Sequence, residues 1–414
     1  MIAKKRIAFS RADRQNPAMN SNEPRHWPVS QTASNAPSSG IVEVFNYGRN
    51  KPGLLPLWVG EGDRPTPAFI HEAAQRSLRD GETFYTYQRG LPELRQAIAA
   101  YMSQLYRQEL EAERFFVTMG GMHALVMAMR LVTDAGDEVI VPTPAWPNFA
   151  GATTVNGARP VEVPMQLGPA GYSLDIDALA AAITPRTRAI CLNSPSNPTG
   201  WTATRAEQQA VLALGRRHGL WIIADEIYGR FYYDGALAPS FHDIMAADDR
   251  ILFVQTFSKN WAMTGLRLGW LEAPPALGPT IENLIQYTTS GVPVPLQRAG
   301  IAALSQGEGL VAELIGQARA NRALLLDTLS GLNRIILPRP SGAFYLFFGI
   351  EGLPDSRMAA LRLVDEALVG LAPGSAFGAS GEGFMRLCYL RKGSDVAEAA
   401  SRLKRWIAAL EDGA

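Results

Sequence analysis

The chain has 414 residues, of which 47% are hydrophobic and 19% charged, a balance typical of globular proteins. Lysine plus arginine and aspartate plus glutamate each number 39, so the formal net charge is zero and indicates neither a nucleic-acid partner nor an acidic membrane surface. No apolar run approaches the ~18 residues of a membrane span, and the length favours two domains.

Cysteine and histidine usage narrows the classes further. The only two cysteines, Cys191 and Cys388, lie in strand-like apolar runs, which excludes a disulfide framework and favours a cytoplasmic protein. The five histidines never approach the spacing of metal ligands, so we expect no metal site.

The first forty residues differ in composition from the rest of the chain. They are polar, basic at the start and rich in serine, asparagine and proline, and they lack the apolar core of a secretory signal. We expect residues 1–40 to be a disordered arm or the product of an upstream start codon, with Met19 as another possible beginning. An organelle transit peptide is the alternative.

From about residue 67 to 291 the pattern alternates between strand and helix, with a helix expected over 123–132. The strands are expected at 114–118, 137–142, 188–192, 220–224 and 251–255. Uninterrupted apolar strands separated by helices are typical of a mainly parallel sheet covered on both faces. We therefore predict an α/β fold whose large, three-layer domain spans 67–291.

After residue 291 the regular alternation of strand and helix ends. The patterns predict helices over 295–329, 358–369 and 395–410 and strands over 342–348 and 384–390. Together with 41–66, residues 292–414 are expected to form a smaller α+β domain.

An unusual segment follows each of the five predicted strands of the large domain. These segments are Gly120-Gly121, Trp146 between two prolines, Asn197-Pro198-Thr199-Gly200, Asp225-Glu226-Ile227-Tyr228 and Ser258-Lys259. In parallel sheets ligands bind beyond the carboxyl ends of the strands. The sequence therefore predicts a single site at this edge of the sheet.

Lys259 lies in the stretch TFSKNWAMTGLRLGW, which contains no acid. A lysine is usually a solvated surface residue. Its position directly after a buried strand, among small, hydroxyl and apolar residues, instead suits a nucleophilic amine. Such an amine needs its pKa lowered from about 10.4 by burial or by other cations.

The other segments suit a phosphorylated, planar cofactor. Gly121 and Met122 begin a helix whose N–H groups would hold a phosphate. Thr256 and Arg267 would add a hydroxyl and a cation to the same phosphate, and Ser258 is an alternative to Thr256 as the hydroxyl donor. The remaining partners are Asp225 for a protonated pyridine nitrogen, Asn197 and Tyr228 for a phenolic oxygen, and Trp146 for the ring face. These features describe pyridoxal phosphate. Asp225 as a helix cap and Trp146 as core are the structural alternatives.

These motifs, with Tyr85-x4-Gly-Leu-Pro-Glu-Leu-Arg95 and Arg386 in its strand, resemble those of the pyridoxal-phosphate-dependent aminotransferases of fold type I (class I/II, aspartate-aminotransferase-like) over about residues 40–410. The resemblance implies an aminotransferase that moves an amino group between an L-amino acid and a 2-oxo acid by a ping-pong, Schiff-base mechanism. It implies Lys259 as the Schiff-base lysine and proton carrier.

The resemblance also implies further roles. Arg386, Gly60 and Asn197 would bind the substrate, and Tyr85 would reach the cofactor phosphate of the neighbouring subunit in a homodimer. Small molecules, rather than nucleic acid or membrane, are the expected partners.

Two departures from the family pattern concern the substrate. The chain reads Gly60-Glu-Gly-Asp63 where relatives often read Gly-Glu-Pro-Asp, and Met122 stands where some acid-specific relatives carry a lysine. An acidic, aromatic or aliphatic donor therefore stays open, with Trp58, Tyr87 and Arg89 as candidates for the substrate pocket.

Three other functions are alternatives. A β-eliminating or decarboxylating enzyme would use the same fold. A transcriptional regulator of this fold would need a larger N-terminal DNA-binding segment, and a binding protein that had lost the cofactor would not need Lys259 and Asp225.

Overall fold

The computed structural model describes residues 28–412. Of the predicted disordered arm, residues 1–27 lie outside the described part of the chain. Residues 28–40 contain the short helix α1 (Gln31–Ser34), whose N-cap is Ser30, and the first residue of α2 (Gly40–Gly48).

The central element is a seven-stranded sheet with the order β2-β10-β9-β8-β7-β3-β4. All five predicted strands are confirmed: β2 (Phe115–Thr118), β3 (Glu138–Thr143), β7 (Thr187–Asn193), β8 (Trp221–Asp225) and β9 (Ile251–Thr256). Two strands of this sheet were not predicted, β4 (Arg159–Pro164) and β10 (Gly269–Glu272). β10 is antiparallel to both neighbours, since the chain turns back after β9 and pairs Gly269 with Thr256, while the other neighbouring pairs are parallel.

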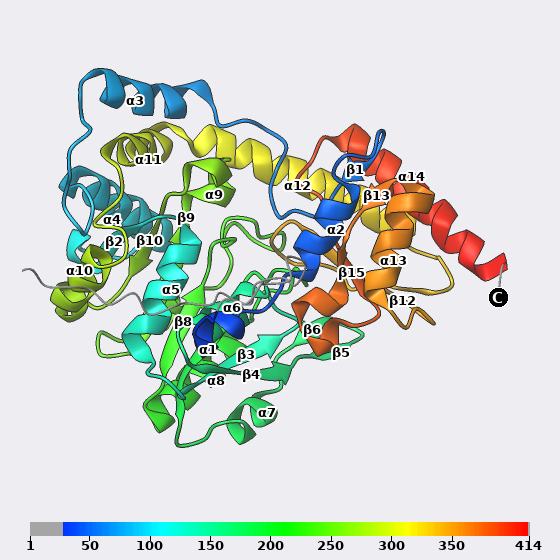
Figure 1. The fold of residues 1–414 in the computed structure, drawn as a ribbon, viewed down its shortest axis with the longest axis horizontal. Helices are drawn as coiled ribbons and strands as arrows, with labels where there is room; N and C mark the ends of the chain where they lie inside the picture. The colour runs from blue at the N-terminus through cyan, green and yellow to red at the C-terminus, as the bar shows by residue number, and fades with distance from the viewer. Residues whose placement is uncertain (1–27, 413–414) are drawn as a thin grey trace, which may run out of the picture.

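Helices cover both faces of this sheet (Figure 1). On one face, α5 (Gly121–Val132), α6 (Asn148–Val155) and α10 (Gly278–Gln286) pack on the strands. On the other, α7 (Ile176–Ala181) and α8 (Arg205–His218) do so. Apolar residues on both faces explain why the strands read as uninterrupted hydrophobic runs. The predicted three-layer α/β architecture is confirmed.

A second sheet, β11-β12-β15-β14, lies at the other end of the molecule (Figure 1). Its strands are β11 (Ile335–Ile336), β12 (Tyr345–Ile350), β15 (Phe384–Cys388) and β14 (Ala372–Pro373). α12 (Glu308–Leu329) and α14 (Gly393–Asp412) pack against each other and on this sheet. The domain boundaries at 67 and 291 stay a prediction.

Two predicted helices of this part differ in the structure. The helical patterns expected over 295–329 form two helices, α11 (Val294–Gln306) and α12, on either side of Gly307. The Trp261 ring lies 2.5 Å from the position that a Cβ at Gly307 would take, so a side chain would clash there. The one expected over 358–369 begins earlier, as α13 (Ser356–Arg362), and continues only as a π-turn to Ala367. Within residues 28–412, none of the helices combines the length and apolarity needed to cross a bilayer.

The segment before the large domain is held by Trp58, which is buried. β1 (Leu55–Pro56) pairs with β13 (Val369–Gly370), and the indole of Trp58 lies directly over Gly370 and Gly48. Since neither glycine has a Cβ, the ring can approach both backbones. This packing places α2 and residues 57–61 beside the junction of the two sheets.

We predict that Gly370→Ala lowers stability. Its methyl group would clash with the Trp58 ring, and overpacking of this kind typically costs about 1–3 kcal/mol. The measurement is the thermal and denaturant midpoint of the protein without ligands. Gly309→Ala is the matched control, since nothing lies within 4 Å of its Cβ position in α12 and a helical alanine should stabilise slightly. Equal midpoints for the wild type and Gly370→Ala would contradict the packing role.

Candidate active site

The carboxyl ends of β7, β8 and β9 meet at one cavity of about 510 Å³. In register, Asn193 lies next to Asp225, so the loops that follow these strands begin side by side. The cavity is lined by nine of the predicted site residues: Gly60, Trp146, Asn197, Asp225, Tyr228, Ser258, Lys259, Arg267 and Arg386. The structure therefore brings together residues that are up to 326 positions apart, from Gly60 to Arg386.

Lys259 lies in the short helix α9 (Phe257–Asn260), which Thr256 caps at the end of β9. Its Nζ donates a 2.7 Å hydrogen bond to the carbonyl of Gly60. Burial lowers the pKa of the Lys259 ammonium to about 8, and the cations Arg386 and Arg267 act in the same direction. A neutral amine is therefore accessible near physiological pH, which is what a nucleophilic lysine needs.

Asp225 ends β8 and is 1% exposed. Its Oδ1 accepts a 3.3 Å hydrogen bond from the Ile227 N–H, and no basic side chain of residues 28–412 lies within 4 Å of its carboxylate. Burial raises its pKa to about 7. A buried acid without a cationic partner is costly, so the site suits a ligand that supplies a positive charge.

Arg386 in β15 is 2% exposed and likewise forms no ion pair within the described residues. Its Nη1 donates to Asn197 Oδ1 at 3.0 Å, its Nη2 donates to the Trp58 carbonyl, and its Nε has no partner. The rings of Tyr345 and Phe377 flank the guanidinium at 4.9 and 5.0 Å. A buried guanidinium with a free donor is suited to a carboxylate.

Tyr345, which the sequence analysis did not identify, joins two of the predicted residues. Its hydroxyl lies 2.7 Å from that of Tyr228. It also fills the space where a Cβ at Gly60 would stand, which explains the glycine there. No local motif marks Tyr345, because its role depends on how β12 lies against the loop after β8.

The predicted phosphate residues cluster at the start of α5. Gly120 caps this helix with φ +81°, and a Cβ on it would lie 2.8 Å from Arg267 Nη2. Thr256 donates to Ser258 Oγ at 2.9 Å, and a Cβ at Gly121 lies 3.3 Å from the Thr256 Cβ. The glycine pair therefore lets helix N–H groups, hydroxyls and a guanidinium lie close together, and these are the groups that bind an anion.

Other predicted residues lie outside this cavity. Met122 lines a neighbouring cavity and accepts a 3.3 Å contact from Asn148 Nδ2 at its sulfur. Tyr85 is 95% exposed and lines a separate surface cavity with Phe84.

Of the three candidates for the substrate pocket, only Trp58 lines the cavity. Arg89 pairs with Glu282 at 2.5 Å and Tyr87 is exposed, so the expectation for these two is wrong within one subunit.

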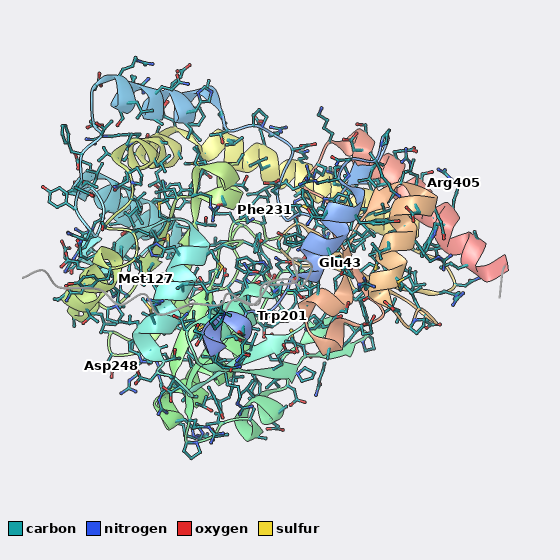
Figure 2. The ribbon with its side chains drawn as sticks, viewed as in Figure 1. Glu43, Met127, Trp201, Phe231, Asp248 and Arg405 are labelled. Carbon is teal, nitrogen blue, oxygen red and sulfur yellow. The ribbon has the colours of Figure 1, made fainter. Side chains whose placement is uncertain are left out.

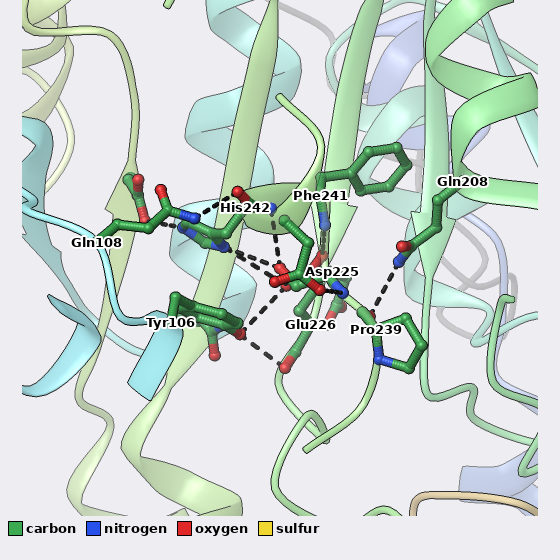
Figure 3. Close-up of polar contacts among 12 residues, drawn as sticks. Tyr106, Gln108, Gln208, Asp225, Glu226, Pro239, Phe241 and His242 are labelled. Atoms are coloured by element: carbon green, nitrogen blue, oxygen red, sulfur yellow. Dashed lines mark hydrogen bonds and ion pairs between the residues drawn. The ribbon is translucent and has the colours of Figure 1, made fainter. Parts of the chain in front are cut away.

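A buried polar network behind Asp225 was also missed (Figure 3). Glu226 accepts from Ser240 Oγ at 2.5 Å and from the Phe241 N–H at 3.1 Å, and His242 lies 2.9 Å from both Ser240 Oγ and Glu272 Oε2. Burial works to lower the pKa of His242, but Glu272 outweighs it and the pKa is raised. The network anchors the residue that follows Asp225, and its members are too far apart in sequence to form a recognisable motif.

The chain is similar to known proteins in both sequence and structure. A family model described as aminotransferase class I and II matches residues 54–403. The aspartate aminotransferase of Pyrococcus horikoshii is 33% identical over 370 residues, covering 89% of this chain and 94% of the relative. The arginine–pyruvate transaminase of Pseudomonas aeruginosa is 36% identical, with 84% and 89% covered. The structure of Thermus thermophilus aspartate aminotransferase with maleate superposes with a TM-score of 0.85 at 31% identity, covering 92% of this chain and 100% of that one.

We predict that Asp225→Asn stabilises the protein when no ligand is bound. The acid ionises near pH 3.8 when unfolded and near 7 when folded, so it destabilises the fold progressively as the pH rises between these values, by up to about 4 kcal/mol above pH 7. Asparagine does not carry this cost. Denaturant unfolding at pH 5 and pH 8 should show a larger gain at pH 8.

Asp248→Asn is the control for this comparison, since Asp248 is exposed on the surface (Figure 2). It should leave stability unchanged at both pH values. A gain for Asp225→Asn that did not grow with pH would show that ionisation of this carboxyl is not the cause.

Proposed function

Because the chain belongs to the aminotransferase class I and II family and is a transaminase, we propose that it transfers amino groups with pyridoxal 5'-phosphate held around Lys259. The observation that carries this proposal is the convergence of three unpaired charged groups on one cavity: an amine with lowered pKa, a buried acid and a buried guanidinium. Each lacks the partner that the cofactor or the substrate would provide.

The residues present fit this cofactor. Gly121, Thr256, Ser258 and Arg267 would hold the phosphate, with the Met122 N–H at the same helix start. The ring would be held by the residues at the ends of the strands, namely Asp225 at its nitrogen, Asn197 and Tyr228 at its oxygen, and Trp146 on its face. Pyridoxal phosphate would supply an aldehyde that exchanges amines and a ring that accepts electrons from the substrate Cα.

The protein's own groups would then direct the proton transfers. Lys259 would take the proton from the substrate Cα and return one to the cofactor side, for which a pKa of about 8 is well matched. The Asp225 carboxylate would keep the ring nitrogen protonated, because the cation removes the cost of its burial. A 2-oxo acid would leave before the second enters, so ping-pong kinetics are expected.

Substrate orientation would depend on Arg386. Nη1 and Nη2 already donate hydrogen bonds to Asn197 and to the Trp58 carbonyl. Nε has no acceptor within the described residues, so a ligand would have to provide one. The α-carboxylate of an amino acid or 2-oxo acid is such a group, with Gly60 beside it. The names of the relatives cover acidic and basic donors alike, so the family does not decide the side chain that this protein prefers.

We predict that Lys259→Ala lowers kcat by more than about 10³-fold, because both the covalent attachment point and the proton carrier are lost. The wild type should show a visible absorption band and, after borohydride reduction, a mass increment on the peptide containing Lys259. Lys404→Ala, an exposed lysine of α14, is the control and should keep both. Normal turnover by Lys259→Ala would exclude the assignment.

The proposed assembly is a homodimer. Phe84 and Tyr85 line one surface cavity and expose 83% and 95% of their surface, and Tyr287 exposes 87%. A second copy of the chain would cover these rings, with Tyr85 reaching the partner's phosphate. We place the protein in the cytoplasm, where buried free thiols such as Cys191 and Cys388 persist.

The dimer proposal predicts complementation between two inactive variants. Co-refolding Lys259→Ala with Tyr85→Ala should restore about a quarter of wild-type activity at limiting cofactor, because half of the dimers are mixed and each of these contains one intact site. The control pair, Lys259→Ala with Asp225→Asn, should restore none, since both residues belong to the same subunit's site. No recovery in the first pair would place Tyr85 outside the partner's site.

A further inference from the structure

We infer that the preferred amino donor is a neutral amino acid with a large apolar, above all aromatic, side chain, and that the cavity-facing side of α2 selects it. This inference rests on the proposed function and names the substrate class of the same cavity. It is carried by the division of the cavity into a polar end and an apolar end.

The apolar end is built by α2 and the segment that follows it. Its side chains are Ile41, Val42, Phe45, Trp58 and Val59. The Phe45 ring meets the Trp58 ring edge-on, with centroids 5.7 Å apart. α2 itself packs on α13 and β14, and Figure 1 shows it between the two parts of the molecule.

This end lies within reach of a substrate held by Arg386. Ile41 packs on the apolar cluster of Phe347 and Phe377, and Phe377 also lies over the Arg386 guanidinium. Trp58 also lines the cavity, and its carbonyl is an acceptor for Arg386. A substrate with its α-carboxylate on Arg386 therefore has α2 beside its side chain.

Charge is distributed unevenly between the two ends. Among residues 28–412, five charged side chains line the cavity. Lys259, Asp225, Arg267 and Arg386 are committed to the cofactor and the α-carboxylate, which leaves Glu61. Glu61 would repel a second carboxylate. It follows Gly60, whose carbonyl accepts from Lys259, and its charge raises the pKa of Lys259.

No cation of residues 28–412 lines the apolar end. Arg49 has its guanidinium 6.0 Å from the Phe45 ring but does not line the cavity. Glu43, labelled in Figure 2, is paired with Arg357 and likewise does not line it. An acidic donor would have to bury its distal carboxylate against aromatic rings without a partner, whereas an aromatic donor would gain ring contacts there.

The first test is a half-reaction panel with the holoenzyme, following conversion of the cofactor by phenylalanine, leucine, alanine, aspartate and arginine. We expect kcat/KM for phenylalanine to be at least tenfold higher than that for aspartate or arginine. It should also be about tenfold higher than that for alanine, since each apolar group of the substrate adds to binding in such a pocket. A preference for aspartate or arginine would overturn the inference while leaving the proposed function intact. If no amino acid converted the cofactor, the proposed function itself would fail.

The second test moves a charge onto α2. Val42 and Tyr47 are 52% and 49% exposed on the same helix, but only Val42 lines the cavity. Val42→Arg should raise kcat/KM for aspartate relative to phenylalanine by about tenfold or more, since it gives the distal carboxylate a partner. Tyr47→Arg should leave this ratio as in the wild type. An unchanged ratio in Val42→Arg, or an equal change in both variants, would show that α2 does not select the donor.

Discussion

The structure depends on one buried cation. The Arg386 guanidinium is removed from water without an ion-pair partner among the described residues, so directed acceptors and ring faces must satisfy it. Asn197 comes from the loop after β7, the Trp58 carbonyl from the segment before the large domain, and Tyr345 from the neighbouring strand β12. Removing any one acceptor would leave a buried charge unsatisfied. A single side chain therefore fixes three remote segments relative to one another.

The same energetic logic applies at the other side of the cavity. Burial moves both the lysine and the aspartate toward their neutral forms, the pKa of Lys259 downward and that of Asp225 upward. A free amine serves covalent chemistry directly. The ionised form of Asp225 destabilises the fold unless a cation lies beside it. Binding of a cationic cofactor would therefore also stabilise the fold. Part of the free energy of cofactor binding would therefore come from pairing Asp225, which has no cationic partner within the described residues.

Shape determines which ligands can use these charges. The absence of a Cβ at Gly60, Gly120 and Gly121 lets the Tyr345 hydroxyl, Arg267 and Thr256, in turn, lie close to these backbones. Gly48 and Gly370 likewise let the Trp58 ring lie against their backbones, and Trp58 is one of the residues that line the cavity. Gly48 and Gly370 thereby determine where Trp58 lies beside the site.

The sequence alone determined five of the seven strands of the central sheet and the chemistry at the ends of these five. Uninterrupted apolar runs identified β2, β3, β7, β8 and β9, and parallel strands must present their carboxyl ends at one edge, so Asn197, Asp225 and Lys259 were placed together without coordinates. Only the tertiary structure decided what lies across from that edge. Tyr345, α2 and the Glu226–His242 network reach the site through packing between segments far apart in the chain, and such contacts leave no local pattern. Arg89 shows the converse case. It lies near a motif in the sequence and was expected in the substrate pocket, but in the structure it pairs with Glu282. Local periodicity encodes elements and their termini, whereas burial between elements decides which side chains surround the substrate.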